Sequence, residues 1–412
     1  MDPENQDFVI IPDRMAFGGE AMGRLPDGRA VFVPFTLPGE RVRARPLETK
    51  RSHVRAELIE VLDASAERIA PRCRHFTQCG GCHYQHIPYH RQLSYKSDIL
   101  RDQLQRLGGL DDVPMRPIIA SPNAFHYRNH LQFHLDAQGR LGFEAMRSNQ
   151  VIAIQECHLP EPALDQVWRL LDIEPLPGLE RVSLRLGGGD EILLILEGSD
   201  LEPFEFSVEE LPLSAALLNS AGKLVLAGSD ALVMEVLGTP LHVSADAFFQ
   251  VNTPMAEALV RHILEILPLN SGDTLVDAYC GVGLFSAFLA PHVGQLIGIE
   301  VSPSACQDFE INLDAHENVA LYQAPVEQAL NAVDFHPQAM LVDPPRAGLT
   351  PGALDGILKQ AAERLVYISC DPATLSRDAK RLRAGGYRLI QVTPFDLFPQ
   401  TYHIESVSLW QR

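Results

Sequence analysis

The sequence lacks any long apolar segment, and its first residues lack the basic start and apolar run of a signal peptide. A membrane-spanning helix needs about 18 uninterrupted apolar residues, and a secretory leader needs a charged start before an apolar core. We therefore expect a cytoplasmic protein without a membrane partner. Apolar residues still make up 46% of the 412-residue chain, which is enough for two or three packed domains.

Positive charge is also scarce, since 34 Lys and Arg stand against 53 Asp and Glu, for a net charge of −19. Neutralisation of phosphates supplies most nonspecific affinity for nucleic acid, so this balance counts against an RNA partner. The charge is uneven, however. Acidic residues crowd one stretch, which contains Asp190, Glu191, Glu197, Asp200, Glu202, Glu205, Glu209 and Glu210. The basic cluster near the start consists of Arg41, Arg43, Arg45, Lys50, Arg51 and Arg55, and such a local face could still bind RNA.

Cysteines are few, and their number, seven, is odd. The cytosol keeps thiols reduced, so the pattern favours metal-binding or catalytic thiols over a disulfide framework. One group contains Cys73, Cys79, Cys82 and the distant Cys157, and such a set can ligate zinc or a [4Fe–4S] cluster. Spacing does not decide between the two. If the metal were zinc, a neighbouring histidine (His75, His83 or His86) could replace one thiolate, although packing or surface roles fit these histidines better.

The first 64 residues predict a small β-barrel, because short strands alternate with Gly, Pro and Asp punctuation between residues 7 and 62. This pattern resembles a TRAM domain, an OB-like RNA-binding barrel, over residues 23–43. Methylthiotransferases combine a TRAM domain with a radical cluster. Their signature has three residues between its first two cysteines, whereas five separate Cys73 from Cys79, and here the barrel comes first, so that alternative is disfavoured.

Residues 65–240 predict a β-rich central domain that carries the cysteine group. A helix over about residues 89–108 is expected to pack on the C-terminal domain, and the GGGD stretch at 187–190 predicts a hairpin turn. From residue 241 onward, and most clearly after Met255, helices alternate with apolar strands. This alternation is typical of a parallel, doubly wound sheet.

A nucleotide-cofactor site is predicted at residues 277–285 (DAYCGVGLF), which follow a strand and open a helix. Gly281 and Gly283 let the backbone pass close to a ligand, and Glu300, at the end of the next strand, can accept hydrogen bonds from ribose hydroxyls. A dinucleotide is the rival cofactor. The run is not G-x-G-x-x-G, however, and a short glycine turn that begins with Asp fits S-adenosylmethionine better.

Three C-terminal motifs predict methylation of an unreactive pyrimidine carbon. They are LVDPPR (341–346), YISCDP (367–372) and HIES (403–406). C5 of uracil is a poor nucleophile until a group adds to C6, and a thiolate is the side chain best suited to add there reversibly. Cys370 is the candidate nucleophile. The reaction then needs a base that removes the C5 proton, and Glu405 is the candidate.

With these motifs the chain resembles the RNA uracil-5-methyltransferase family, over nearly its whole length. The resemblance implies that Cys370 attacks C6, that S-adenosylmethionine methylates C5 and that Glu405 removes the C5 proton. It also implies that the base is flipped out of its stack. Residues that bind the cofactor or line the target pocket would be Gln250, Tyr279, Gly281, Gly283, Glu300 and Asp343. Family members often carry Asn at the position of Leu284 and a polar residue near Pro325.

The cluster-bearing branch of that family implies four ligands, Cys73, Cys79, Cys82 and Cys157, for a structural [4Fe–4S] cluster rather than zinc. Arg128, in an aromatic and basic stretch, becomes an RNA contact by the same resemblance. Phe248 and Phe249 receive no role, because such residues more often belong to the core.

The prediction is therefore a multidomain α/β and β protein with a TRAM-like barrel (1–64), a cluster-bearing central domain (65–240) and a Rossmann-like methyltransferase domain (241–412). We expect a monomer that methylates a uridine of 23S rRNA. The closest alternative keeps the chemistry and moves the target to the T-loop of tRNA. An inactive RNA-binding protein is the alternative of another class, and intact Cys370 and Glu405 argue against it.

Overall fold

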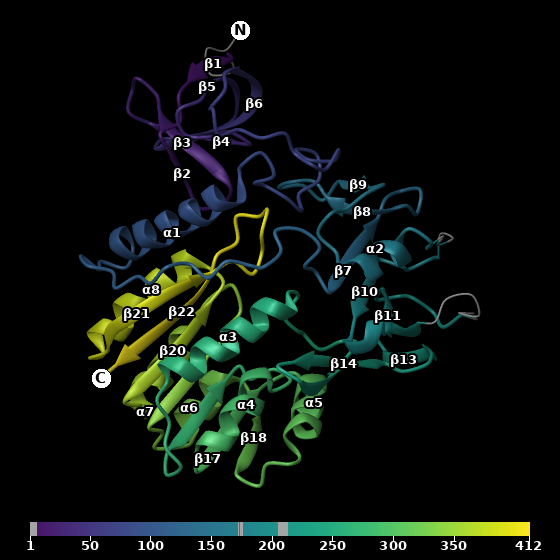
Figure 1. Cartoon of the computed structure of the whole chain (residues 1–412), viewed down its shortest axis with the longest axis vertical. Coiled ribbons are helices and arrows are strands. Elements are labelled where there is room, and N and C mark those ends of the chain that lie inside the picture. Colours follow the sequence, from purple (N-terminus) through teal and green to yellow (C-terminus); the bar gives the residue numbers. More distant parts are fainter. Residues whose placement is uncertain (1–5, 172, 174–175, 205–212) are drawn as a thin grey trace.

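The computed structural model describes residues 6–171, 173, 176–204 and 213–412 (Figure 1). Three residues of the predicted acidic stretch, Glu205, Glu209 and Glu210, lie outside the described residues, as do the first five residues of the chain. Among the described residues, no helix is both long and apolar enough to cross a membrane.

The N-terminal strands form a six-stranded sheet in the order β1-β5-β6-β4-β3-β2 within the described residues. They are β1 (Phe8–Ile10), β2 (Arg14–Met15), β3 (Glu20–Arg24), β4 (Ala30–Pro34), β5 (Arg41–Thr49) and β6 (His53–Asp63). Buried and exposed residues alternate along the first half of β5, which places Val42 and Ala44 in a small core and Arg41, Arg43 and Arg45 outside it. The short strands predicted from the sequence are therefore present as β-strands.

The central region is built on a second sheet, in the order β13-β12-β11-β10-β7-β8-β9 in the described part of the chain. Its elements are β7 (His130–Leu135), β8 (Leu141–Glu144), β9 (Val151–Ala153), α2 (Pro162–Trp168), β10 (Arg181–Leu186), η2 (Gly188–Asp190), β11 (Ile192–Glu197), β12 (Ser214–Asn219) and β13 (Gly222–Ala227). β10 pairs antiparallel with β11, which confirms the hairpin predicted at residues 187–190. A two-stranded ribbon, β14 (Ala231–Val236) and β15 (Thr239–Ser244), follows.

The C-terminal region contains a third sheet, in the order β18-β17-β16-β19-β20-β22-β21 among the described strands. Its strands are β16 (Thr274–Ala278), β17 (Gln295–Glu300), β18 (Val319–Gln323), β19 (Ala339–Val342), β20 (Arg364–Ser369), β21 (Arg388–Phe395) and β22 (Glu405–Gln411). Strands β16 to β20 pair in parallel, whereas β22 pairs antiparallel with both β20 and β21. The predicted doubly wound parallel sheet is therefore present and carries an antiparallel edge.

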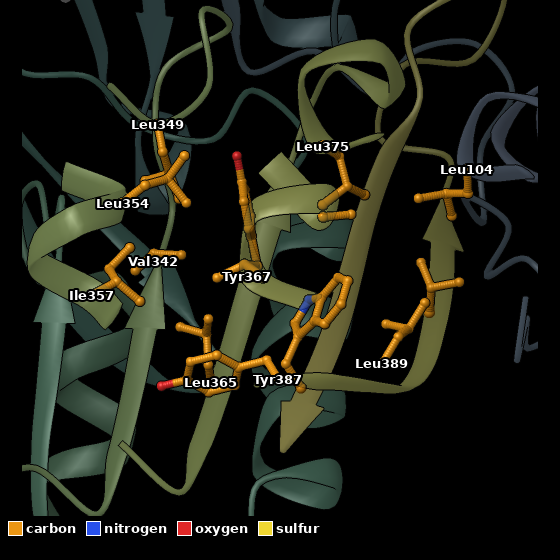
Figure 2. Packing of buried hydrophobic residues seen from close by; sticks show 14 of the residues in the cluster. Leu104, Val342, Leu349, Leu354, Ile357, Leu365, Tyr367, Leu375, Tyr387 and Leu389 are labelled. Atoms are coloured by element: carbon orange, nitrogen blue, oxygen red, sulfur yellow. The ribbon is translucent and has the colours of Figure 1, made fainter. Parts of the chain in front are cut away.

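Helices cover both faces of this sheet. They are α3 (Thr253–Ile266), α4 (Leu284–Leu289), η3 (Ala290–His292), α5 (Pro303–Leu313), α6 (Val326–Ala332), α7 (Pro351–Gln360) and α8 (Pro372–Ala384). Alternate strand residues face opposite sides, so Val342, Leu365 and Tyr367 pack against α7 and α8, as Figure 2 shows. Leu341 and Val366 belong instead to the core with α3, α4 and α5.

Helix α1 (Tyr89–Arg106) lies between the N-terminal sheet and the C-terminal region, along α8 (Figure 1). Its apolar residues Ile99, Leu100 and Leu104 belong to the same core as Leu389 of β21. The predicted packing of this helix on the C-terminal region is therefore present.

Candidate active site

The glycine turn between β16 and α4 takes left-handed backbone conformations at Tyr279, Gly281 and Gly283. Gly283 has a φ of 91°, and a Cβ there would lie 2.6 Å from Leu313 Cδ2, so a side chain at this position would be strained and would displace the end of the Leu313 side chain. A Cβ on Gly281 would meet no described atom within 4 Å. The turn therefore has open space at Gly281, where a ligand could approach the backbone.

Glu300 ends β17, as predicted, and its carboxylate faces this turn. Oε2 accepts a hydrogen bond from the Gly281 N–H (3.0 Å), and Oε1 accepts bonds from the N–H groups of Val301 (2.7 Å) and Ser302 (2.8 Å). These bonds hold the carboxylate beside the turn in one orientation. The arrangement fits an acceptor for ribose hydroxyls.

Two carboxyl groups lie deeper, at the ends of β16 and β19. Asp277 is fully buried, and its Oδ2 accepts a bond from Ser286 Oγ (2.6 Å), while Oδ1 has no partner among the described residues. Burial raises the pKa of Asp277 to about 7, and burial together with the charge of Asp277 raises the pKa of Asp343 to about 7. Two neighbouring buried carboxyl groups favour a cationic ligand, and the sulfonium and ammonium groups of S-adenosylmethionine fit that requirement.

Strand pairing brings Cys370 and Glu405 together. Ser369, the last residue of β20, pairs with Ser406 of β22, so the next position of each strand places Cys370 level with Glu405. Burial raises the pKa of Cys370 to about 12, and the charges of Glu405 and Asp343 add to that effect. Burial and Asp343 also raise the pKa of Glu405 well above its usual range. The structure therefore brings the predicted nucleophile, the predicted base and Asp343 close to one another.

The turn after Cys370 is fixed by local sequence. Asp371 caps α8, since its Oδ1 accepts bonds from the N–H groups of Ala373 (2.8 Å) and Thr374 (2.9 Å), and Pro372 occupies the first turn of the helix. Asp at an N-cap followed by Pro is a favoured helix start. Cys370 is thus held between a strand end and a capped helix.

Arg346 is a site residue that the sequence reasoning left without a role. Its positive charge lowers the pKa of both Cys370 and Glu405, against the effect of burial. Its Nη2 lies 3.4 Å from Nε2 of His403, whose pKa burial lowers to about 3. The imidazole is therefore neutral, so Arg346 rather than His403 supplies positive charge that favours the Cys370 thiolate. The position of Arg346 directly after Asp343-Pro-Pro, at the end of a predicted strand, was the sequence feature that could have indicated a role in the site.

Gln250 lies on the loop between β15 and α3. It is buried, as is Phe249, whereas Phe248 is 72% exposed. The assumption that both phenylalanines belong to the core is therefore wrong for Phe248.

The four cysteines of the predicted cluster line one cavity of about 80 Å³, the cysteine cavity. They come from two segments, residues 73–82 and residue 157, and all four are half-buried. Burial raises the pKa of each thiol, that of Cys157 to about 12. In the described part of the chain, however, no group of three or more His, Cys, Asp or Glu side chains is arranged to hold a metal ion. The four thiols therefore line the same cavity, but the described residues are not arranged as a metal site.

Arg128 also lines the cysteine cavity. Its guanidinium carbon lies 6.0 Å from the centre of the Tyr127 ring, and its buried Nε has no partner among the described residues. Burial lowers the pKa of Arg128, but Tyr127 and, after it, the charges of Cys82 and Cys157 raise that pKa above its usual value. Arg128 thus faces the cysteines rather than an open surface, and its contact with RNA stays a prediction.

The basic cluster is largely neutralised by carboxylates of the same barrel. The ion pairs are Arg41 with Asp63 (3.3 Å), Arg43 with Glu60 (2.9 Å), Arg45 with Asp7 (2.9 Å), Lys50 with Glu48 (2.9 Å) and Arg55 with Glu20 (2.8 Å). Of the six cations, only Arg51 has no carboxylate partner in the part of the chain that the structure describes. A cation that already has a partner offers less to an RNA phosphate, so the cluster is a weaker phosphate-binding face than its sequence predicted.

Comparisons with known proteins agree with this geometry. Residues 233–412 match the family model "tRNA (Uracil-5-)-methyltransferase", and residues 9–59 match the TRAM domain. An RNA methyltransferase of Chlorobaculum tepidum is 34% identical over 95% of this chain and 94% of its own. One of Aquifex aeolicus is 33% identical over 98% and 99%.

Among solved structures, the tRNA (uracil-54, C5)-methyltransferase of Pyrococcus abyssi in complex with S-adenosyl-L-homocysteine has a TM-score of 0.74. It is 22% identical and covers 98% of this chain and 100% of its own, which shows a common fold. The predicted TRAM domain and methyltransferase fold are thereby confirmed. The chain belongs to the RNA methyltransferase family whose C-terminal part is the tRNA (uracil-5-)-methyltransferase domain.

Proposed function

We propose that this protein methylates C5 of a specific uridine in RNA, with Cys370 as the covalent nucleophile and Glu405 as the base. The observation that carries the proposal is the pairing of β20 with β22, which places the thiol and the carboxyl at one level beside Asp343. Both groups stand at the C-terminal edge of the parallel strands, where ligands bind in open α/β sheets.

The chemistry follows from these positions. The Cys370 thiolate forms a bond to C6, and the electrons of the C5=C6 bond move to give an enolate. When bound, S-adenosylmethionine supplies the methyl group that this enolate takes at C5 and leaves as S-adenosylhomocysteine. Glu405 then takes the C5 proton, the C5=C6 bond reforms, and the C6–S bond breaks so that its electron pair returns to Cys370.

Electrostatics of the pocket couple donor binding to the nucleophile. Four acidic groups, Asp277, Asp343, Cys370 and Glu405, have raised pKa values, first because of burial and then because of the charges of neighbouring acidic groups. A sulfonium cation among them favours their ionised forms. We propose that the thiol becomes a nucleophile chiefly when the donor is bound, with Arg346 acting in the same direction.

For the donor itself, we propose that Glu300 accepts hydrogen bonds from the ribose and that Gly281 and Gly283 give the backbone its close approach. Tyr279 and Gln250 would line the donor or target pocket. The target base must leave its stack to reach Cys370. Phe248 is exposed and lies two residues before Gln250 in the sequence, so its ring could stack on RNA bases next to the one that is flipped out.

We further propose that the cysteine cavity holds a structural [4Fe–4S] cluster, with zinc as the less suitable metal. The support is that four thiols from two segments line one cavity, and that Arg128 supplies positive charge there. The ligands would be Cys73, Cys79, Cys82 and Cys157. Because burial raises the pKa of these thiols, loading must displace protons.

In this proposal the domains are residues 1–64, 65–240 and 241–412, and the protein acts as a cytoplasmic monomer. Its substrate is 23S rRNA, as the resemblance to the cluster-bearing branch implied, with Arg128 as an RNA contact. The second candidate is tRNA, which is favoured by the name of the matching family model.

The test is incubation of the anaerobically purified protein with methyl-labelled S-adenosylmethionine and, separately, unmodified 23S rRNA and tRNA, followed by digestion to nucleosides. Label in 5-methyluridine from one RNA supports the reaction and selects the substrate. Cys370→Ala should give no label and no covalent adduct, whereas Glu405→Gln should accumulate a methylated adduct. Glu363→Gln, at an exposed position, is the matched control. Full activity in Cys370→Ala would refute the mechanism.

A further inference from the structure

We infer that Gln92 and Lys96 of α1 are positioning residues for Glu405, which they hold in place through residues 396–400, the connector. The connector is the first part of the chain between β21 and β22, and Glu405 is the first residue of β22. The inference rests on the proposed function, since it takes Glu405 as the base. It adds that proton removal is controlled by a helix that lies outside the methyltransferase sheet.

The buried face of α1 is unusual for a helix that packs on a core. Gln92 and Lys96 are both fully buried, four residues apart and therefore on one side of the helix. An amide or ammonium group in such a place is unfavourable unless hydrogen bonds replace its water. Their partners therefore explain why these two polar residues occupy core positions.

Gln92 and Gln400 form a reciprocal pair across 308 residues of sequence. Gln92 Nε2 donates to Gln400 Oε1 (3.0 Å), and the Gln400 backbone N–H donates back to Gln92 Oε1 (3.0 Å). Gln92 Nε2 also lies 2.9 Å from the Ile87 carbonyl oxygen. Gln400 has a φ of 67°, a left-handed conformation that a residue other than glycine rarely keeps without such support. Gln92 therefore fixes an unfavourable turn of the backbone.

Lys96 holds the other end of the connector. Its Nζ donates to Asp396 Oδ1 (2.6 Å) and to the Phe398 carbonyl oxygen (3.0 Å), and both charged side chains are fully buried. Two residues one helical turn apart thus bind both ends of a five-residue segment.

Further anchors come from other parts of the chain. Asn252 Nδ2 donates to the Leu397 carbonyl (3.0 Å), and Tyr127 OH donates to the Pro399 carbonyl (3.1 Å). The N–H groups of His83 (2.8 Å) and Tyr84 (2.9 Å) donate to the Gln400 carbonyl. Every connector residue is therefore held from outside. Glu405 pairs with Phe395, the residue directly before the connector, so the connector lies in the chain between the two paired residues.

Cys370 is positioned independently of the connector, by the end of β20 and the cap that Asp371 makes on α8. A looser connector should therefore leave addition to C6 and methyl transfer largely intact while it misplaces the base. Small displacements of a catalytic group can reduce its rate by roughly 100-fold. The distinctive result would be a methylated covalent RNA adduct that is released slowly.

The experiment uses the full-length protein with three variants. Gln92→Met removes the amide at similar length. Gln400→Gly keeps the left-handed backbone, which glycine tolerates, and removes the side chain. Gln105→Met, at an exposed position of the same helix, is the control. Turnover, the fraction of labelled protein–RNA adduct after denaturation, and affinity for S-adenosylhomocysteine are measured on each.

We expect Gln92→Met and Gln400→Gly to lower turnover by roughly 10–100-fold and to accumulate methylated adduct, with cofactor affinity unchanged within about twofold. Gln105→Met should match the wild type in all three measurements. If Gln92→Met does not fold, the turnover and adduct fraction of Gln400→Gly test the inference.

Lower turnover without accumulated adduct, or a change in thermal stability alone, would overturn the inference. A wild-type protein that forms neither adduct nor 5-methyluridine on any RNA would instead refute the proposed function. The two failures are therefore distinguishable.

Discussion

Replacing Lys96 with methionine should destabilise the C-terminal region strongly. Lys96 and Asp396 have no exposed side-chain area and form an ion pair of 2.6 Å, and the second carboxylate oxygen of Asp396 has no partner among the described residues. Burial lowers the pKa of Lys96, and the charge of Asp396 opposes that shift. Removal of one member of such a pair leaves the other charge buried and unpaired, which costs about 3–5 kcal/mol. Methionine keeps the apolar stem, so little packing is lost.

The assay is urea unfolding of the full chain followed by tryptophan fluorescence. The chain has two tryptophans, and Trp410 is fully buried in the core that also contains residues of α1, so a Trp168→Phe background reports this region. The double variant with Asp396→Leu should recover at least about 2 kcal/mol, because no charge then remains unpaired. Lys380→Met, at an exposed position, should stay within about 0.5 kcal/mol of the parent. A loss below about 1 kcal/mol for Lys96→Met would refute the reasoning.

Three further predictions concern the two ligand sites. Gly283→Ala should destabilise the protein and weaken cofactor binding, because its Cβ would lie 2.6 Å from a neighbouring side chain. Gly281→Ala should lower the free energy of unfolding by only about 1–2 kcal/mol, the cost of a left-handed backbone at a residue with a side chain. Calorimetric unfolding of both variants with and without S-adenosylhomocysteine measures the difference. The raised pKa values of Asp277 and Asp343, about 7, mean that the cofactor-free protein loses stability as pH rises from about 4 through 7. A cation offsets that loss, so the increase in melting temperature caused by S-adenosylmethionine should be larger at pH 8 than at pH 6; an equal increase would contradict the assignment. Cys157→Ser should lower the iron and sulfide content of anaerobically purified protein, and an unchanged content would exclude it as a ligand.

Much of the site could be predicted from short motifs, because local rules set their geometry. A cysteine between an apolar strand and Asp-Pro has to lie at a strand end before a capped helix, and Cys370 does. Glu300 could be placed at the end of its strand by the same kind of argument. The parallel sheet followed from alternating helix and strand patterns.

The rest depends on contacts between distant residues, which one sequence does not reveal. Gln92 and Gln400 are 308 positions apart, and nothing in the helical pattern of residues 89–108 indicates a polar partner for that face. The arginines of β5 looked free in the sequence because their carboxylate partners lie on neighbouring strands. Arg346 had no assigned role because its effect on Cys370 exists only in the folded pocket.

The paired cations of the barrel have a consequence for how the enzyme searches among cellular RNAs. Ribosomal and transfer RNAs contain very many phosphates and few target uridines. A protein with an unpaired basic surface would therefore be bound most of the time to phosphates far from a target uridine. With its arginines already paired and a net charge of −19, this protein should leave nontarget RNA quickly. A long residence time should then require a correctly shaped RNA with its base in the pocket, so that kinetic discrimination arises from fast release rather than tight capture.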